Sequence, residues 1–76
     1  MKELLLYIAR SLVQHPDHVT VTEVETGDEL TLELRVAPED MGRVIGRQGR
    51  IAKEIRTLIR SYAQRTGVKA SVDIVD

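Results

Sequence analysis

Two segments of the chain place their hydrophobic residues at helical spacing, and each predicts an amphipathic helix with one buried side. In residues 2–14 the leucines, isoleucine and valine recur every three or four positions. Pro16 predicts the end of this helix, because the residue before a proline is pushed out of the α region. The second pattern begins at Ile51 and repeats at intervals of three and four to Tyr62. Gly67, a favoured residue just past a helix, follows it.

Three other segments have the composition and alternation of β-strands. Residues 19–24 are β-branched except for Glu23. A Gly27–Asp28 turn separates them from residues 30–36, where leucine or valine alternates with polar residues. These two strands are expected to pair as a hairpin. Residues 68–74 alternate in the same way and predict a third strand.

A short helix is predicted between the second and third strands, ahead of the long one. Pro38 suits its first turn, and the two acidic residues that follow complement its N-terminal dipole. It is expected to end at Ile45. The predicted order is therefore α-β-β-α-α-β, an α+β fold in which three helices pack on one face of a three-stranded sheet. The crossover between the last two strands is long enough for parallel, right-handed pairing.

The other face of the predicted sheet is expected to meet water. Six polar residues alternate with the apolar ones in the second and third strands and belong to this face. They are Thr31, Glu33, Arg35, Lys69, Ser71 and Asp73. No repeat, linker or low-complexity segment interrupts the pattern, so we expect one domain over residues 1–76.

Composition supports a water-soluble globular domain held together by its core alone. Apolar residues make up 42% and charged residues 30% of the 76 residues, which is typical of a folded domain. There is no cysteine, so neither disulfides nor thiolate zinc ligands are expected. The apolar run near the N-terminus is too short to span a membrane and lacks a small-residue cleavage site, so we expect a cytoplasmic protein.

The distribution of charge changes the picture that the net charge gives. The formal net charge is −1, which by itself argues against a nucleic-acid-binding protein. From Arg43 to Lys69, however, there are eight cations against one anion, a net charge of +7, while the rest of the chain carries −8. Such a bipolar small domain is typical of a one-sided surface for a polyanion. A solvated basic helix accounts for the asymmetry equally well.

The basic segment contains a glycine loop between the two C-terminal helices. Gly46 and Gly49 frame Arg47 and Gln48, and such a turn lets a ligand approach the backbone without meeting a Cβ atom. The helix that follows directs its free N–H groups, and a charge of roughly +0.5, toward the same place. The glycine spacing and the preceding helix exclude the GxGxxG and Walker nucleotide loops. An anion site and an ordinary helix–helix turn both remain open.

The loop resembles the K-homology (KH) signature, Ile-Gly-x-x-Gly in a helix–loop–helix, and the predicted order of elements matches the type II KH fold. Residues 12–19, 36–42 and 46–53 extend the likeness, so the chain is similar over its whole length to the small stand-alone bacterial KH proteins of the KhpA family. The resemblance implies binding of single-stranded RNA, with the loop clamping the backbone of about four nucleotides. The bases would lie in a groove between the two helices and the central strand.

The loop and its flanks supply the residues that this resemblance implies for RNA binding. The glycines admit the sugar–phosphate backbone, the cations neutralise phosphates, and the glutamine donates or accepts hydrogen bonds. The candidate RNA-binding residues are Arg43, Ile45, Gly46, Arg47, Gln48, Gly49, Arg50 and Lys53. Val44, Ile45 and Ile55 are candidates for an apolar groove wall, with core packing as the alternative for at least one of them.

Aromatic residues are scarce, and this limits the expected affinity. Tyr7 and Tyr62 both fall at core-like helical positions, so base stacking is expected to contribute little. Affinity should then depend on phosphates and fall with salt, with a slope in log K of about −0.7 for each phosphate neutralised on a single strand. With roughly two to four phosphates engaged, one copy should bind weakly, and tight binding would need a partner or a second copy.

No enzymatic activity, cofactor or metal is expected. His15 and His18 lie in a predicted loop without a serine, cysteine or paired carboxylate arranged for catalysis, and are most simply solvated. The resemblance implies an RNA chaperone or post-transcriptional regulator, associated with cell size, cell shape and peptidoglycan homeostasis. It also implies a partner in KhpB, a larger KH protein with a second nucleic-acid-binding domain, or else a homodimer. The rival interpretation is a dimerisation module whose glycine loop is only a turn.

Overall fold

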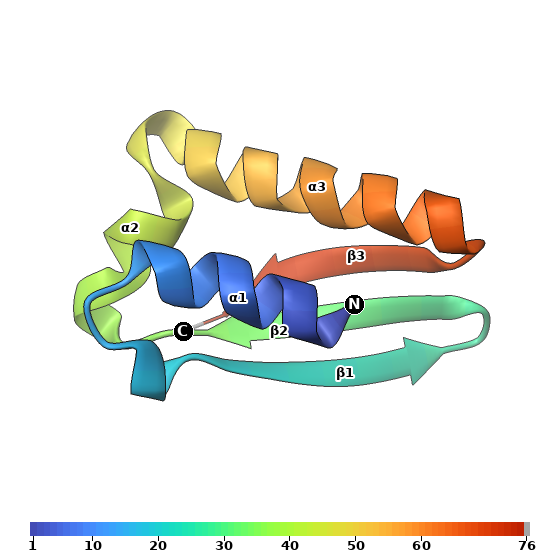
Figure 1. The fold of residues 1–76 in the computed structure, drawn as a ribbon, viewed down its shortest axis with the longest axis horizontal. Helices are drawn as coiled ribbons and strands as arrows, with labels where there is room; N and C mark the ends of the chain where they lie inside the picture. Colours follow the sequence, from blue (N-terminus) through green and yellow to red (C-terminus); the bar gives the residue numbers. More distant parts are fainter. Residues whose placement is uncertain (76) are drawn as a thin grey trace.

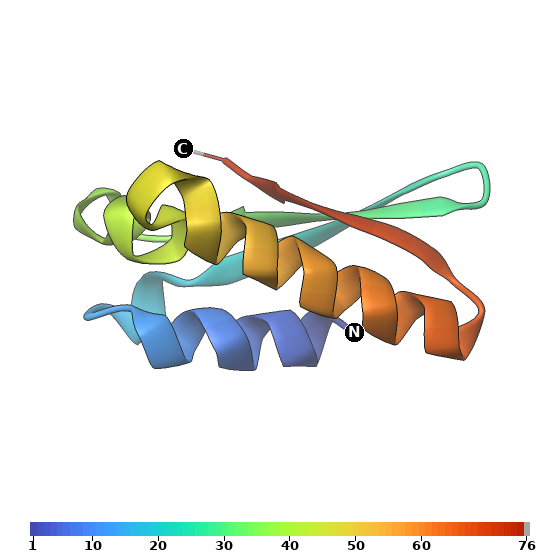
Figure 2. The same ribbon diagram turned by 90° about the horizontal axis from the view of Figure 1, so that it is seen from above.

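Helices cover one face of a three-stranded sheet, as Figures 1 and 2 show. The computed structural model describes residues 1–75. The helices and strands in chain order are α1 (Lys2–Leu12), β1 (Thr20–Thr26), β2 (Glu29–Arg35), α2 (Met41–Ile45), α3 (Arg50–Thr66) and β3 (Lys69–Ile74). Single 3-10 turns between them are η1 (Pro16–His18), η2 (Pro38–Asp40) and η3 (Arg47–Gly49). The predicted order α-β-β-α-α-β is confirmed. Within residues 1–75 no helix is both long and apolar enough to cross a membrane.

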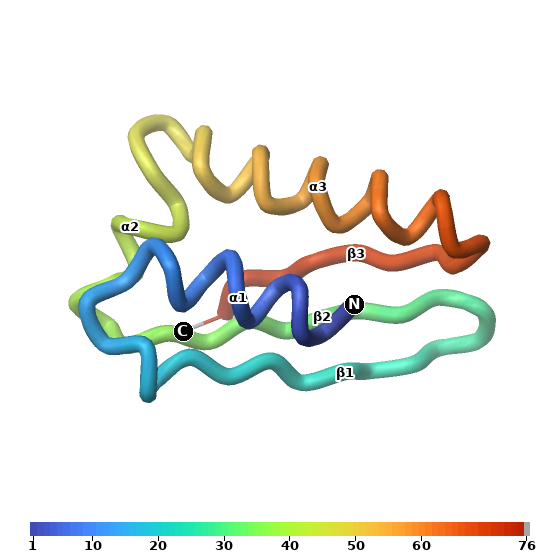
Figure 3. The backbone as a smooth tube through the Cα atoms, viewed as in Figure 1, coloured from blue at the N-terminus to red at the C-terminus, as the bar shows by residue number. Residues whose placement is uncertain are grey.

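The sheet has the order β1-β2-β3, so β2 is the central strand. β1 and β2 pair antiparallel, with Val21 opposite Leu34, and Gly27 at φ 62° makes the tight turn between them. β2 and β3 pair parallel, with Leu32 beside Val72. Figure 3 traces the crossover, in which the chain leaves β2, passes through α2 and α3, and returns alongside β2. The predicted hairpin and the parallel pairing are both confirmed.

The core lies between the inner face of the sheet and the facing sides of α1 and α3. Side chains alternate along a strand, so every second residue points toward the helices. The buried core residues are Leu5, Ala9, Val19, Val21, Leu32, Leu34, Val44, Ile55, Ile59 and Val72. Burying each of the larger ones contributes roughly 1.5–3 kcal/mol. The buried positions of α3 are Ala52, Ile55, Ile59 and Ala63. Of the repeat that the sequence predicts, Ile55 and Ile59 are therefore buried, whereas Leu58 is 53% exposed and does not belong to the buried side.

The opposite face of the sheet is polar, as the alternation predicts. Of the six polar residues expected there, three are exposed and three are half-buried. The Thr31 and Ser71 hydroxyl oxygens lie 3.5 Å apart across the β2–β3 pair, so neighbouring side chains shield one another. Figure 2 shows α1 and α3 together on the other side of the sheet, with α2 near the end where β2 leaves it.

The end of α1 differs from the prediction, and the difference has a specific cause. The hydrophobic pattern predicts a helix to residue 14, but α1 ends at Leu12, and Val13 is extended with φ −102° and ψ 164°. The N–H groups of Gln14 and His15 are donated to the Asp40 carboxylate at 3.1 and 3.0 Å, and not to helical carbonyls. A tertiary contact 25 positions along the chain therefore ends the helix before the proline does.

The expectation that both tyrosines belong to the core is wrong. Tyr7 is 72% exposed and Tyr62 is 43% exposed. At about 100° per residue, Tyr7 lies roughly 200° around α1 from the buried Leu5, on the far side of the helix. Tyr62 lies roughly 60° from the buried Ile59, at the margin of the buried side of α3. Helical spacing identifies the buried side, but it does not decide the burial of residues at its edge.

Candidate nucleic-acid interface

The glycine loop joins α2 to α3 and lies at the start of α3, at the top left of Figure 1. The Gly46 N–H donates to the Gly42 carbonyl oxygen at 2.9 Å and ends α2, and the Gly49 N–H donates to the Gly46 carbonyl oxygen at 3.2 Å. The Arg50 N–H is donated to the carbonyl of Arg47. These three N–H groups are engaged by carbonyl oxygens of α2 and the loop. The backbone therefore offers an anion less than the sequence predicts, and side chains matter more.

Left-handed backbone conformations shape the loop. Gly46, Gln48 and Gly49 have φ angles of 76°, 58° and 74°. A Cβ atom added at Gly46 would lie 2.9 Å from the backbone nitrogen of Ile51, so packing as well as conformation requires glycine there. A Cβ atom added at Gly49 would meet nothing within 4 Å. The space beside Gly49 is therefore open to a ligand. Gln48 adopts a conformation that costs a non-glycine residue roughly 1–2 kcal/mol, and such strain clusters at functional sites.

Cationic side chains surround the loop. Arg47, Arg50 and Lys53 are exposed, and among residues 1–75 none of them forms an ion pair. Arg43 is also exposed, but its Nε lies 3.4 Å from the Asp40 carboxylate. The positive charge available to a ligand is therefore concentrated on the first three side chains, while Arg43 is partly neutralised.

The structure gives Asp40 a role that the sequence does not reveal, since the sequence indicates only that it complements the N-terminal dipole of the short helix. Its side chain is fully buried, accepts hydrogen bonds from the N–H groups of Gln14 and His15, and faces Arg43. Burial by itself raises the pKa of this carboxyl. The two hydrogen bonds and the charges of His15 and Arg43 outweigh burial and hold the pKa below its usual value. The carboxylate thus ties the end of α1 to the start of α2, the helix that leads into the loop.

Apolar side chains near the loop divide between core and surface. Val44 is fully buried and Ile55 is 2% exposed, so of the two alternatives that the sequence leaves open, core packing holds for both and neither lines a groove. Ile45 is 36% exposed and borders an open hollow of about 430 Å³. The residues that line this hollow are Val36, Pro38, Met41 and Ile45. An apolar surface therefore adjoins the loop, and Ile45 is the predicted site residue that contributes to it.

Residues 2–74 match the family model described as KhpA/KhpB, KH domain. The chain belongs to the KhpA/KhpB family of KH domains. It is 55% identical over 75 residues to the RNA-binding protein KhpA of Clostridium acetobutylicum. That alignment covers 99% of this chain and 100% of the Clostridium protein. It is 49% identical over 76 residues to the RNA-binding protein KhpA of Listeria monocytogenes, and that alignment covers 100% of both chains. The family resemblance that the loop and the order of elements predict is confirmed.

Solved structures of Era contain the same fold. An Era variant from Aquifex aeolicus bound to GDP·AlF4− aligns with this KH domain with a TM-score of 0.66 and 22% identity, over 96% of this chain and 28% of that chain. Era in complex with MgGDPNP and nucleotides 1506–1542 of 16S ribosomal RNA gives the same TM-score with 21% identity. The chain therefore spans 28% of the length of Era. At these identities the likeness concerns the fold.

The two histidines of this KH domain lie in and beside η1, with their rings 5.8 Å apart. His15 Nε2 is 3.6 Å from a carboxylate oxygen of Glu39, and His18 Nε2 is 4.0 Å from one of Asp17. Over residues 1–75, no three histidine or acidic side chains gather closely enough to hold a metal ion. Both imidazoles are partly exposed beside surface carboxylates.

A second apolar surface, here called the helix patch, lies between α1 and α3 around an open hollow of about 370 Å³. Its residues are Leu4, Tyr7, Ile8, Leu58, Ser61, Tyr62 and Arg65. Tyr7, Leu58 and Tyr62 are 72%, 53% and 43% exposed. At about 100° per residue, Leu58 and Tyr62 lie on the side of α3 roughly opposite to Lys53 and Arg60. The apolar and basic surfaces of this KH domain therefore occupy different sides of one helix.

Proposed function

We propose that this KH domain binds single-stranded RNA by clamping the sugar–phosphate backbone on the Gly46–Gly49 loop. The observation that carries the proposal is a group of exposed cations, Arg47, Arg50 and Lys53, that have no ion-pair partner among residues 1–75. They surround Gly49, beside which the space is open. Backbone phosphates supply the negative charge that this surface lacks. The full-length relatives carry the name RNA-binding protein KhpA, which supports the same function.

We assign unequal roles to the proposed binding residues, because their surroundings and ion pairing differ. The residues proposed to bind RNA are Arg43, Ile45, Gly46, Arg47, Gln48, Gly49, Arg50 and Lys53. Gly49 admits the backbone, and Arg47 and Arg50 neutralise phosphates on either side of it. Ile45 presents an apolar surface to a base at the neighbouring hollow. Arg43 contributes less than the other cations, because the Asp40 carboxylate already faces it.

The double variant Arg47→Asp with Gln48→Asp tests the clamp. Both residues are exposed, and aspartate tolerates the left-handed conformation at position 48 better than most residues, so the fold should persist. The change introduces negative charge where phosphates are expected. Fluorescence anisotropy at low salt should show affinity for a single-stranded RNA reduced by at least about tenfold.

A matched control places the same change in charge elsewhere. Arg10→Asp with Ser11→Asp alters two exposed residues of α1 by the same net charge, and should leave affinity near that of wild type. If the loop variant is folded by circular dichroism and binds RNA as well as wild type, the clamp is wrong. Equal losses in the two double variants would also count against it, because general charge repulsion would then explain the result.

A specific observation favours a second function, association with another protein through the helix patch. The patch exposes two tyrosines and a leucine next to one another. Along α3, Glu54 precedes Leu58 and Tyr62, and Arg65 follows them. If the α3 helices of two copies packed antiparallel, Glu54 of each copy would therefore lie near the arginine of the other. We propose that the patch binds a second copy of this chain or a larger KH protein of the KhpB type.

Leu58→Asp tests this association. Sedimentation equilibrium should show wild type associating with rising concentration and the variant remaining monomeric, with Thr57→Asp, an exposed position on another side of α3, behaving as wild type. Monomeric wild type that also fails to bind a KhpB-type KH protein would exclude the proposal. If wild type associates but binds no RNA, the dimerisation module is the better description of the chain.

The role in the cell is a further step that the family resemblance supports. We propose an RNA chaperone or post-transcriptional regulator that acts in the cytoplasm and is connected with cell size and the envelope. Crosslinking in cells followed by sequencing of the bound RNA should recover a set of transcripts that the Arg47→Asp, Gln48→Asp variant does not. Equal recovery by the two proteins would argue against a regulatory role that acts through the loop.

A further inference from the structure

The loop accounts for only one end of the basic surface of α3. Lys53, Arg56 and Arg60 follow one another at intervals of three and four positions and so share one side of the helix. All three are exposed, and within residues 1–75 none of them is in an ion pair. Arg56 Nε donates a hydrogen bond to the Val72 carbonyl oxygen at 3.2 Å, so this side of α3 borders β3. A row of cations therefore runs from the loop along the border between α3 and β3.

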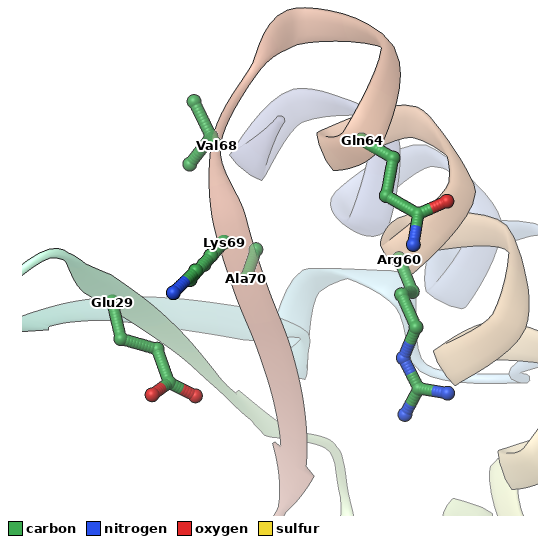
Figure 4. Close-up of a pocket in the computed structure, with 6 residues that line it drawn as sticks. All are labelled: Glu29, Arg60, Gln64, Val68, Lys69 and Ala70. Atoms are coloured by element: carbon green, nitrogen blue, oxygen red, sulfur yellow. The ribbon is translucent and has the colours of Figure 1, made fainter.

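The row ends at an open hollow of about 280 Å³ beside the last turns of α3 (Figure 4). Its lining residues are Glu29, Arg60, Gln64, Val68, Lys69 and Ala70. In Figure 4, Arg60 and Gln64 extend from α3 on one side of β3, and Glu29 and Lys69 lie on the other side. Lys69 Nζ is 3.7 Å from the Asp28 carboxylate. Within residues 1–75, Arg60 is therefore the cation of this hollow that no carboxylate neutralises.

We propose that single-stranded RNA continues from the glycine loop along the border between α3 and β3, and that Arg60 binds a phosphate beyond those held at the loop. The inference rests on the proposed function, because the loop makes the first contact. Continuity of positive charge with the loop favours a polyanion as the occupant. The apolar helix patch on the other side of α3 has the character expected of a protein-binding surface.

The length of α3 sets the size of RNA that reaches Arg60. From Arg50 to Arg60 the helix rises about 15 Å, at 1.5 Å per residue. A strand covers this distance with roughly four nucleotides at a stacked spacing of 3.4 Å, and with fewer when it is extended. An RNA of about four nucleotides fills the loop clamp, whereas one of about ten nucleotides reaches Arg60 as well.

The test compares Arg60→Gln with Arg10→Gln. Arg10 on α1 is the matched control because it is exposed, has no ion pair among residues 1–75, and lies outside both the basic row of α3 and the helix patch. Binding of RNAs of about four and about ten nucleotides is measured by anisotropy over a salt series. Arg60→Gln should weaken the longer RNA by roughly three- to tenfold, reduce its salt slope by about 0.7, and leave the shorter RNA unchanged. Arg10→Gln should leave the affinity for both RNAs unchanged.

Three results overturn the extended path. Arg60→Gln can leave the affinity for the longer RNA unchanged, can weaken binding of both RNAs equally, or can act no more strongly than Arg10→Gln. In each case the loop clamp still stands if Arg47→Asp with Gln48→Asp weakens binding of both RNAs by at least about tenfold. If wild type binds neither RNA, the proposed function fails, and the extended path fails with it.

Discussion

Gly46 and Gly49 both have positive φ, yet only Gly46 is also required by packing. A side chain at Gly46 would collide with Ile51, whereas one at Gly49 would enter open space. Gly46→Ala should therefore destabilise the fold by roughly 2–4 kcal/mol, from left-handed conformation and overpacking together. Gly49→Ala should cost only the conformational part, roughly 1–2 kcal/mol. Urea denaturation of the two variants measures this difference.

Gly49→Ala consequently tests the clamp in a protein that is still folded. The new methyl group would occupy space that the RNA backbone is proposed to enter, so affinity should fall several-fold in a protein that is still folded. Gly27→Ala is the control, because Gly27 also has positive φ and open surroundings but lies in the β1–β2 turn. Equal RNA affinity of the two alanine variants would mean that the backbone does not approach Gly49.

The Asp40 carboxylate makes the stability of the fold depend on pH. Its folded pKa lies below the unfolded value of about 3.9, so its contribution is complete above that value and is lost as pH falls through the folded pKa. Asp40→Asn should lower the melting temperature by several degrees at neutral pH, because an amide replaces the charge that Arg43 and two N–H groups face.

Thermal unfolding of wild type and Asp40→Asn over a pH series measures this dependence. The gap between the two proteins should narrow from about pH 5 downward, as wild type loses its carboxylate. A gap that stays constant to pH 2 would show that the charge of Asp40 does not contribute. The sequence could not predict this role, because a local pattern places Asp40 at a helix start, while its partners Gln14 and His15 lie in the distant segment that follows α1.

At the scale of elements, periodicity predicts α3 well and α2 poorly. Seventeen residues of α3 contain enough turns to fix its buried side. The five residues of α2 contain no repeat, and only packing separates the buried Val44 from its neighbour Ile45, which is 36% exposed. The exposure of Tyr62 also depends on packing, because the spacing of residues along α3 does not show that the side of α3 facing α1 is only partly covered. The position of the loop could be predicted from the sequence, but which apolar side chains beside it are buried could not.

Arg56 connects two elements, and its substitution separates hydrogen bonding from charge. Arg56→Lys keeps the positive charge but loses the Nε–H that is donated to the Val72 carbonyl on β3. It should lower the free energy of unfolding by roughly 0.5–1.5 kcal/mol, as should Arg56→Ala. Only the alanine variant should also lose RNA affinity. Urea denaturation and anisotropy on the same samples provide both readings, and a lysine variant as stable as wild type would show that the hydrogen bond does not contribute.

At the scale of the whole molecule, the fold separates the two charge blocks of the sequence. The +7 block from Arg43 to Lys69 includes the loop and α3, and most of the −8 remainder is on the β1–β2 hairpin and η2. Figure 1 shows α3 at one side of the molecule and β1 at the other. This arrangement should orient an approaching RNA, because the acidic side repels phosphates while the basic side attracts them.

Glu23 and Glu25 on β1 offer a way to test that orientation, since both are exposed and neither is in an ion pair among residues 1–75. Glu23→Gln with Glu25→Gln should raise the association rate with RNA at low salt and leave the dissociation rate unchanged, because the residues act at long range. The gain should disappear near 1 M salt, where the Debye length is about 3 Å.

Stopped-flow fluorescence at low protein concentration suits the measurement. β1 is an edge strand, and its glutamates also discourage pairing between chains, so a low concentration keeps the variant from associating through β1. A faster dissociation rate, or a gain that persists in high salt, would place the effect in direct contacts and not in the field of the molecule.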